Sequence, residues 1–371
     1  MVLILVVPLL VLILVAVSRV PRPDDYVNVG RFTSGGQMMF SDTSRGFSKA
    51  KDPAVVRFND KYFLYYTVKQ NEVVTGLRIG VATSEDLLIW KKWGELEVEH
   101  DYEKRGFGAP GAIVLNGKVH LFYQSSGNGR RDAICHAWSD DGYSFTRNSS
   151  NPIFRPTGRW NAGRAIDADV IEHEGRLLLY YATRDPSMKV QMQGVAAAPV
   201  DSDFGRDTWT QLNPDGPILK PELPWETNCI EAAALCKHGG KLYMFYAGGY
   251  NNDPQQIGCA ISSDGVKWRR LFDTPFLPNG KEGEWNSSES GHPYAFTDDD
   301  GVTYLFYQGN GDNGRSWFLS KATIGWKDGI PFLDAAGDRR MAGDRRMAGA
   351  GVREQGSVLQ GAGVPVLEFR I

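Results

Sequence analysis

The sequence of 371 residues predicts an all-β fold, a five-bladed β-propeller of four-stranded antiparallel blades. An aromatic strand motif returns five times between residues 50 and 325. A tight polar turn precedes each copy, and no sustained 3.6-residue apolar period appears. Repeats of this kind also occur in solenoids, but units of about 60 residues that contain hairpins are more typical of propeller blades.

The aromatic motif is the expected second strand of each unit, and every copy ends in a tyrosine. The five final tyrosines are separated by 57, 58, 65 and 61 residues, so the units are nearly evenly spaced. The copies span residues 62–66, 119–123, 177–181, 242–246 and 303–307. Hairpin turns connect them to a shorter apolar first strand, at Asn59-Asp60, Asn116-Gly117, Glu174-Gly175, Gly239-Gly240 and Asp300-Gly301.

Two further strands complete each unit. Segments rich in small residues, such as 79–82, 133–137 and 257–260, predict a third strand. Ser-x-Asp turns that lead to an aromatic residue, at 84–90, 139–145 and 263–268, predict a fourth. Helix is therefore expected to be a minor part of the fold.

The two ends of the chain differ in composition from the repeats. Residues 1–17 are apolar apart from Pro8, and Ala16 and Ser18 fit the −3 and −1 positions of a cleavage site. We expect residues 1–20 to be a signal peptide or a membrane anchor, and we favour the cleaved peptide. Either alternative predicts an exported domain, which is periplasmic, secreted or membrane-anchored.

The C-terminal end repeats the hexapeptide GDRRMA at residues 337–348 and then runs into Gly- and Ala-rich sequence. Such a composition does not supply a packed core. We therefore expect a catalytic propeller over residues 45–325 and a low-complexity, disordered tail over residues 333–371.

Charge and cysteine usage exclude several classes of function. The formal net charge is −3 and no long Lys/Arg run is present, so nucleic acid is not an expected partner. A membrane is an expected partner only through an uncleaved N-terminal segment. The four cysteines have no metal-ligand spacing and are expected to be buried apolar residues, although one disulfide remains an alternative.

Acidic residues mark the starts of three expected first strands, which line the central channel of a propeller. Asp52 precedes Lys61 by nine residues, Asp167 precedes Arg176 by nine, and Glu231 precedes Lys241 by ten. The other two blades carry Ala109 and His292 near this position. Glycoside hydrolysis needs one protonated carboxyl and one ionised carboxylate, and a third acid can raise the donor's pKa. The pattern therefore predicts a glycosidase with Asp52, Asp167 and Glu231 as its catalytic acids.

The motifs Asp52-Pro53, Ile166-Asp167 and Glu231 resemble those of glycoside hydrolase family 43, whose five-bladed clan also includes families 32 and 68 and resembles family 117. The resemblance implies that Asp52 is the general base, Glu231 the general acid, and Asp167 the residue that modulates the acid's pKa. It also implies an inverting enzyme that cleaves a terminal glycosidic bond in a plant or algal oligo- or polysaccharide. No cofactor is expected to be required.

Departures from the family pattern leave the sugar open. Ala232-Ala233 follow Glu231 where the family usually has Gly-Pro, and Ala168 follows Asp167 where it usually has Pro. Arg184-Asp185-Pro186 matches a motif of the fructan-active families, but it follows an aromatic strand, so we expect Asp185 in a loop. Asp169 is expected on the same side of its strand as Asp167.

Five further residues are candidates for substrate binding. Arg164, three residues before Asp167, is placed to hold that carboxylate or a sugar hydroxyl. Indoles commonly stack on sugar faces, and histidines at the start of blade five are associated in the family with an axial water or calcium. The candidates are Arg164, Trp160, Trp225, Trp285 and His292, with a structural calcium held through water as an alternative role for His292.

Three alternative functions remain open. A non-catalytic carbohydrate-binding propeller would use the acids to bind hydroxyls, and a fructan-type glycosidase would retain the anomeric configuration. Phosphorolysis on the same fold requires a cluster of basic residues near the acids, for which Arg164 is the obvious candidate.

Overall fold

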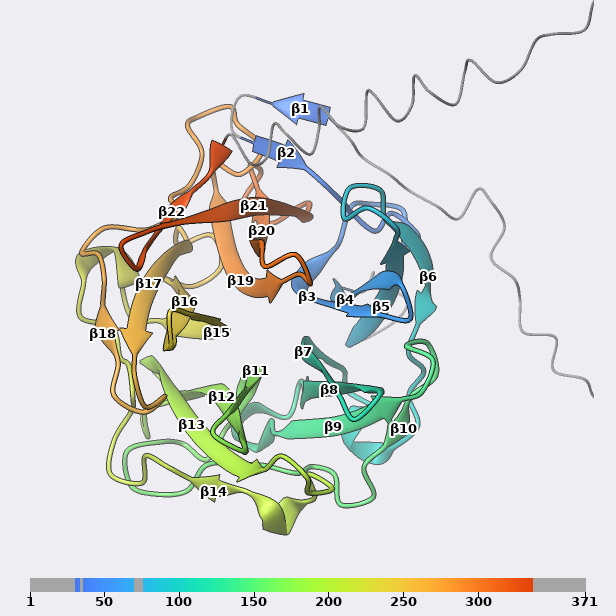
Figure 1. Cartoon of the computed structure of the whole chain (residues 1–371), viewed down its shortest axis with the longest axis vertical. Helices are drawn as coiled ribbons and strands as arrows, with labels where there is room; N and C mark the ends of the chain where they lie inside the picture. Colours follow the sequence, from blue (N-terminus) through green and yellow to red (C-terminus); the bar gives the residue numbers. More distant parts are fainter. Residues whose placement is uncertain (1–30, 34–35, 70–75, 336–371) are drawn as a thin grey trace, which may run out of the picture.

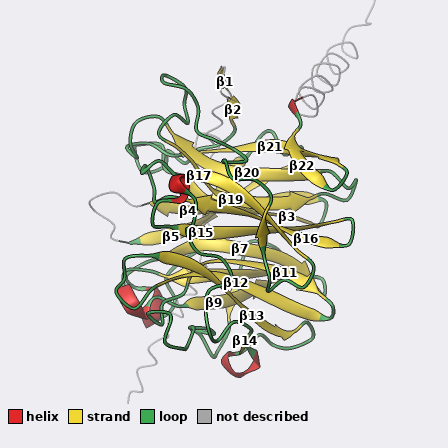
Figure 2. Cartoon of the chain, turned by 90° about the vertical axis from the view of Figure 1, so that its left-hand side faces the viewer, coloured by secondary structure: helices red, strands yellow, loops and turns green. Residues whose placement is uncertain are grey.

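The computed structural model describes residues 31–33, 36–69 and 76–335. It contains five four-stranded antiparallel sheets arranged around a central axis (Figure 1), which confirms the predicted five-bladed propeller. In the perpendicular view of Figure 2, strands and loops make up nearly all of the described chain. Within these residues, no helix has the length and apolar character needed to cross a bilayer.

The five sheets follow one another along the chain, and each runs outward from its innermost strand. Blade one consists of β3 (Lys51–Phe58), β4 (Lys61–Lys69), β5 (Leu77–Ser84) and β6 (Lys91–Glu95). Blade two consists of β7 (Phe107–Leu115), β8 (Lys118–Ser125), β9 (Ile134–Ser139) and β10 (Thr146–Arg147). Blade three consists of β11 (Ile166–His173), β12 (Arg176–Arg184), β13 (Gln191–Pro199) and β14 (Thr210–Gln211).

The last two blades repeat this order. Blade four consists of β15 (Ile230–His238), β16 (Lys241–Gly248), β17 (Gln256–Ser262) and β18 (Arg269–Arg270). Blade five consists of β19 (Glu289–Thr297), β20 (Thr303–Asn310), β21 (Phe318–Lys327) and β22 (Ile330–Leu333). A separate pair, β1 (Arg31–Thr33) and β2 (Gly36–Met38), precedes them, and short 3₁₀ turns lie at Asp101–Glu103, Gly129–Arg131, Arg206–Thr208 and Pro224–Glu226.

Two-residue turns join the first two strands of blades one to four, as predicted. Both turn residues have positive φ, for example 49° at Asn59 and 59° at Asp60, which is the geometry of a type I′ hairpin. Blade five differs from the prediction, because Thr297 pairs with Thr303 and the loop between them holds five residues. Its Gly301 has a φ of 82°.

The small residues of the third strands have a packing role. In every blade, the final tyrosine of the second strand pairs across the sheet with a small residue of the third strand. A Cβ added at Gly80, Gly194 or Gly258 would lie 2.4 Å from the ring of the paired tyrosine. The partners of Tyr66, Tyr123, Tyr181, Tyr246 and Tyr307 are Gly80, Cys135, Gly194, Gly258 and Ser320. The apolar core accordingly fills the spaces between neighbouring blades.

Residues 39–50, which lead into blade one, pair with the third strand of blade five and the residue before it. Met39 and Phe40 donate backbone hydrogen bonds to Leu319 of β21, and Lys49 bridges to Trp317. Because β22 ends at Leu333, blade five extends beyond the expected boundary at residue 325 and includes the first residue assigned to the tail. The expected signal peptide or anchor of residues 1–20, and the tail from residue 336 onward, lie outside the described residues.

Candidate active site

A β-bulge interrupts the first strand of every blade at an equivalent position. Pairing between the first two strands breaks off and resumes three residues later in each of the five sheets. The first of the two unpaired residues in each break has a positive φ between 41° and 52°, a strained conformation for any residue except glycine. These residues are Asp52, Ala109, Asp167, Ala232 and His292. Backbone strain thus recurs at an equivalent position in every blade, and in blades one, three and five the strained residue is one of the candidate functional residues.

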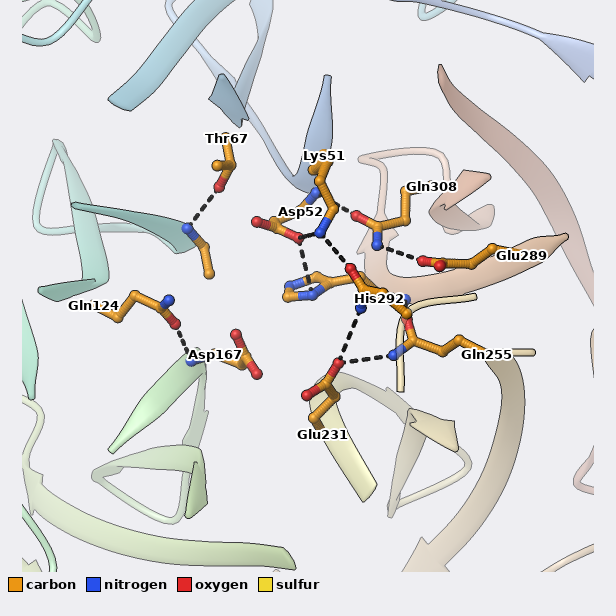
Figure 3. Close-up of polar contacts among 12 residues, drawn as sticks. Lys51, Asp52, Thr67, Gln124, Asp167, Glu231, Gln255, Glu289, His292 and Gln308 are labelled. Atoms are coloured by element: carbon orange, nitrogen blue, oxygen red, sulfur yellow. Dashed lines mark hydrogen bonds and ion pairs between the residues drawn. The ribbon is translucent and has the colours of Figure 1, made fainter. Parts of the chain in front are cut away.

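The bulges correct the expected register of blade four. Asp52 and Asp167 occupy bulge positions, whereas the equivalent residue of blade four is Ala232, so Glu231 lies one residue earlier. Figure 3 nevertheless shows the carboxyl groups of Asp52, Asp167 and Glu231 pointing toward one another from three different blades. All three residues are buried, at 6% to 7% exposure.

Polar side chains from the preceding blade support four of the bulges. The backbone N–H of Asp52 donates to Gln308 Oε1 at 2.9 Å, and that of Asp167 donates to Gln124 Oε1 at 2.9 Å. The remaining two supports are the N–H of Ala109 to Thr67 Oγ1 at 2.7 Å and the N–H of His292 to Gln255 Oε1 at 3.2 Å. Asp52 and Asp167 are therefore each positioned by the packing of two blades and not by their own strand alone.

Asp52 has a cationic and hydrogen-bonding environment. His292 Nδ1 lies 3.1 Å and Lys51 Nζ 3.9 Å from Asp52 Oδ1. Burial alone would raise the pKa of Asp52, but His292, Lys51 and a hydrogen bond from Thr67 outweigh it and hold that pKa below the ordinary value. Burial lowers the pKa of His292 despite the attraction of Asp52 and Glu231. Asp52 is accordingly an ionised carboxylate at neutral pH.

Asp167 has the opposite electrostatic environment. Burial, followed by repulsion from Glu231 and Asp52, raises its pKa well above the ordinary value. Arg164 and Lys51 offset only part of this shift. The three acids therefore form a cluster in which one carboxylate is stabilised in its charged form and another in its neutral form.

Glu231 is surrounded by side-chain amides. Gln255 Nε2 donates to Glu231 Oε1 at 2.7 Å, and Asn251 Nδ2 lies 3.5 Å from the same oxygen. Gln191 Nε2 donates to Glu231 Oε2 from blade three. The thiol of Cys229 also hydrogen-bonds to Glu231, and Cys229, like the other three cysteines, is free and buried.

Two arginines approach this cluster through Gln191. Arg164 donates to Asp132 Oδ2 at 3.2 Å and to Gln191 Oε1 at 3.3 Å, so its ion-pair partner is Asp132 and not Asp167. Arg184 donates to the same Gln191 oxygen at 2.9 Å. With Lys51, the site has three cationic side chains, of which the sequence indicated only Arg164.

The predicted tryptophans mostly serve packing. Trp225 stacks on Tyr246 at 5.9 Å between ring centroids, and its Nε1 donates to the carbonyl of Asp273. Trp285 packs on Tyr307 and is 8% exposed, which leaves little of its ring for a sugar. The half-buried Trp160 has an Nε1 without a hydrogen-bond partner among the described residues, and its contact with substrate stays a prediction.

Asp169 and Asp185, the two alternatives to Asp167 in the sequence, have other roles. The bulge separates Asp169 from Asp167, contrary to the expected common side: Asp169 lines an axial cavity of about 440 Å³. Its carboxyl accepts the N–H groups of Val170 and Leu235, both at 2.8 Å, and thereby links blade three to blade four. Asp185 follows β12 in a loop, as predicted, and accepts backbone N–H groups there.

Several residues of the site were not among the candidates identified in the sequence. Glu289, a fourth acid, begins β19 and is fully buried, and burial raises its pKa to about 7. Gln308 Nε2 donates to Glu289 Oε1 at 2.7 Å while its Oε1 supports Asp52. Glu289 could have been identified as a candidate because it lies three residues before His292, but the glutamines belong to no recognisable motif.

The site does not bring together a set of protein ligands for a metal. Among residues 31–33, 36–69 and 76–335, no group of three or more His, Cys, Asp or Glu side chains is arranged to hold an ion. His292 contacts Asp52 but is not part of such a set. A calcium bound to His292 through water stays a prediction.

Comparison with known proteins relates this geometry to carbohydrate-active enzymes. Two relatives come from Thermoanaerobacter sp. (strain X514). A 1,2-β-oligomannan phosphorylase is 24% identical over 219 residues, which cover 57% of this chain and 68% of that protein. A β-1,2-mannobiose phosphorylase is 30% identical over 130 residues, which cover 31% of this chain and 41% of that protein.

Solved structures share the fold. A thermostable family 43 glycoside hydrolase superimposes with a TM-score of 0.62 at 21% identity, over 80% of this chain and 96% of its own. A family 32 β-fructofuranosidase from Bombyx mori superimposes with a TM-score of 0.62 at 15% identity, over 80% of this chain and 64% of its own.

The family itself is identified by sequence. Residues 47–331, which span all five blades except the last two residues of β22, match the model for Glycosyl hydrolases family 43. The match covers well over half of the 371 residues. The chain therefore belongs to glycosyl hydrolase family 43 and is a glycosidase-type enzyme with a carbohydrate substrate.

Proposed function

We propose that this protein hydrolyses a terminal glycosidic bond of a plant or algal oligo- or polysaccharide with inversion at the anomeric carbon. The observation that carries the proposal is the cluster of three buried carboxyl groups at the channel-lining strands, in which the pKa of Asp52 is lowered and the pKa of Asp167, beside Glu231, is raised. Hydrolysis by two carboxyl groups requires one ionised and one protonated group.

In the proposed reaction, Asp52 accepts a proton from a water molecule while the water oxygen bonds to the anomeric carbon. The bond from that carbon to the leaving oxygen breaks, and a carboxylic acid supplies the proton that the leaving oxygen takes. The family resemblance assigns this donor role to Glu231, with Asp167 modulating its pKa. Inversion follows because water attacks the face opposite to the leaving group.

A panel of nitrophenyl glycosides, including arabinofuranosides, xylosides, galactosides and mannosides, tests the proposal. We expect release of nitrophenol from one sugar class, and NMR of the first-formed product should give the anomer opposite to that of the substrate. A first product of the same configuration would favour the retaining, fructan-type alternative. Binding of sugars without cleavage of any substrate would favour a carbohydrate-binding propeller.

Phosphorolysis is a second candidate because of the cations near the acids. Lys51, Arg164 and Arg184 converge on the acids or on their amide partners, and they offer positive charge to an inorganic phosphate. The two Thermoanaerobacter relatives are named as phosphorylases. In this reaction a phosphate oxygen replaces water as the nucleophile, and the product is a sugar 1-phosphate.

β-1,2-Linked manno-oligosaccharides, incubated with and without inorganic phosphate, separate the two reactions. Hydrolysis releases free mannose in phosphate-free buffer. Phosphorolysis depends on phosphate and yields mannose 1-phosphate. Arg184→Met should lower the phosphate-dependent reaction more than hydrolysis, because Arg184 offers positive charge to phosphate but affects Glu231 only through Gln191.

Export of the domain is also proposed, from the apolar segment of residues 1–17. Mass analysis of the mature N-terminus, together with cell fractionation, distinguishes a cleaved peptide from an anchor. An intact N-terminus in the cytoplasmic fraction would contradict export.

A further inference from the structure

A basic groove lies between blades two and three, and none of its lining residues belongs to the acid cluster. It has a volume of about 550 Å³, which falls within the range of about 300–1,000 Å³ that is typical of ligand-binding pockets. One wall comes from residues 152–157, in the segment that joins blade two to blade three. The other wall comes from residues 206–211, which include β14, the outermost strand of blade three (Figure 1).

Three guanidinium groups give the groove its positive charge. Arg131, Arg155 and Arg206 line it, and none of its lining residues is acidic. Within the part of the chain that the structure describes, none of these three arginines forms an ion pair with a carboxylate. Asp132, which follows Arg131, pairs with Arg164 instead, and Asp207 follows Arg206 but does not line the groove. The charge of the three arginines is therefore not neutralised inside the groove.

Backbone carbonyl groups fix the orientation of two of these guanidinium groups. Arg155 Nε donates to the carbonyl of Gly163 at 2.8 Å, and Arg206 Nε donates to the carbonyl of Pro152 at 3.0 Å. The Nη2 of each arginine donates to a second carbonyl. A guanidinium group has five N–H donors, so the Nη1 donors of both arginines remain for a ligand. Both groups are thus positioned before a ligand binds, which lowers the entropic cost of binding.

An indole lies beside the three arginines. Trp209 lines the same groove and is half-buried. Its Nε1 donates to the carbonyl of Phe204 at 3.1 Å, so its polar edge is already satisfied. The ring also packs against Phe122, which keeps it in place. An aromatic surface next to anion-binding groups suits a sugar ring that carries an acidic group better than it suits a bare inorganic anion.

The groove is connected to the loop that leads into the acid cluster. Arg155 bonds to the carbonyl of Gly163, the residue before Arg164. Arg131 precedes Asp132, whose carboxylate lies 3.2 Å from Arg164 Nε. Two of the three groove arginines therefore adjoin the ion pair through which Arg164 is held beside the cluster.

We propose that this groove binds an anionic sugar residue of the substrate, outside the site of cleavage, and that the enzyme acts on acidic polysaccharides. The inference rests on the proposed glycosidase function and adds the substrate class. The recognised group is an oxyanion on a sugar ring, either a uronate carboxylate or a sulfate ester, because planar guanidinium groups bind such groups through paired hydrogen bonds. The net charge of the protein is −3, so the attraction is local to the groove.

Calorimetric titration with oligosaccharides of equal length tests the binding. Oligogalacturonate, a sulfated galactan fragment and a neutral galacto-oligosaccharide provide the carboxylated, sulfated and uncharged ligands. We expect one of the acidic ligands to bind about 10-fold more tightly than the neutral one at low salt, and added salt should reduce this preference. Comparison of the two acidic ligands identifies the oxyanion. Equal affinity for all three ligands would overturn the proposal.

Substitution of the arginines locates the site. The double variant Arg131→Gln/Arg206→Gln should lower affinity for the preferred acidic ligand by about 10-fold, because two exposed charge pairs are lost, and should change affinity for the neutral ligand less. Arg269→Gln is the matched control, because it removes the same charge from an exposed arginine in β18 of blade four. An equal loss of affinity in the control would contradict a specific groove.

Competition experiments test whether the groove recognises a sugar and not any anion. Inorganic sulfate and single-stranded DNA, each at the same concentration of negative charge as the acidic oligosaccharide, should displace it poorly. Displacement by either competitor as effective as that by unlabelled oligosaccharide would show an unspecific anion site and overturn the proposal.

Kinetics separate this inference from the proposed function. The double variant should lower kcat/KM for an acidic polysaccharide more than for a nitrophenyl glycoside, which is too small to reach the groove. If no glycoside is cleaved, the proposed function fails while the titrations still decide the groove; if glycosides are cleaved without a preference for acidic ligands, only the inference fails. Thermal unfolding checks that each variant is folded. If the double variant does not fold, Arg131→Gln decides alone, because the Arg131 side chain makes no hydrogen bond to the described residues.

Discussion

Asp52→Asn removes the proposed general base and leaves the site otherwise intact. The substitution preserves the shape of the side chain, and the backbone N–H that Gln308 accepts at 2.9 Å is unchanged. Asparagine also tolerates the φ of 50° at this bulge better than most residues. We therefore expect the variant to fold with a free energy of unfolding close to that of the wild type.

The expected loss of activity is large because solvent cannot replace the base. Only 6% of Asp52 is exposed, and His292 and Lys51 hold it in its ionised form. General base catalysis contributes about 10²–10⁴-fold, and we expect the upper half of that range, which corresponds to about 4–5 kcal/mol of transition-state stabilisation.

Steady-state kinetics on an activated aryl glycoside and on the natural glycan measure this effect. The rate should fall for both substrates, since both need an activated water. In the wild type, the acidic limb of the kcat/KM profile should lie below the ordinary Asp pKa, because the pKa of Asp52 is lowered. Asp185→Asn, in a loop outside the cluster, is the matched control and should keep its turnover. Near-wild-type turnover of Asp52→Asn on the natural glycan, or an equal loss in the control, would refute the assignment of the base.

Three further predictions follow from the surroundings of the site. Burial raises the pKa of Asp169 from 3.8 to about 8, so the folded protein holds a proton that the unfolded chain releases; the free energy of unfolding should fall as pH rises from about 4 to about 8, and Asp169→Asn should weaken this dependence in denaturant titrations, because the raised pKa values of Asp167 and Glu289 act in the same direction. Gln308→Leu leaves the Asp52 N–H and Glu289 without their partner, and should cost about 1–3 kcal/mol of unfolding free energy and lower kcat, whereas an unchanged kcat would argue against a positioning role. Truncation after residue 335 should preserve activity, but truncation after residue 325 should destabilise the protein in thermal unfolding because it removes β22 from blade five.

The repeat architecture could be predicted because each of its signals is local. A type I′ turn requires two residues with positive φ, and Asn116-Gly117 or Gly239-Gly240 identify it within two positions. Each aromatic strand needs a small residue opposite its final tyrosine, which explains the composition of the third strands. The boundary at residue 325 was wrong because β22 is short and lies next to low-complexity sequence.

The predicted equivalence of Glu231 with Asp52 and Asp167 was only partly correct. Counting back nine residues from Lys61, Arg176 and Lys241 gives Asp52, Asp167 and Ala232, so the one-residue offset of Glu231 was visible in the sequence, but the bulge in β15 that makes the two positions different was not. A bulge depends on how two strands pair, and no residue type in this segment announces it. The same bulge in β11 directs Asp169 into the axial cavity although it lies only two residues after Asp167.

The sequence by itself determined the blade count and the three acids, because strand periodicity, turn chemistry and acidic residues at blade starts are all visible along the chain. Only the tertiary structure decided the surroundings of those acids. Gln191, Asn251 and Gln255 lie 40, 20 and 24 residues from Glu231, and their amides are oriented by Arg164, Arg184, Lys51 and His292 from three other blades. The protonation of a buried carboxyl group depends on the donors and charges within a few ångströms of it, and in a propeller those groups come from distant repeats.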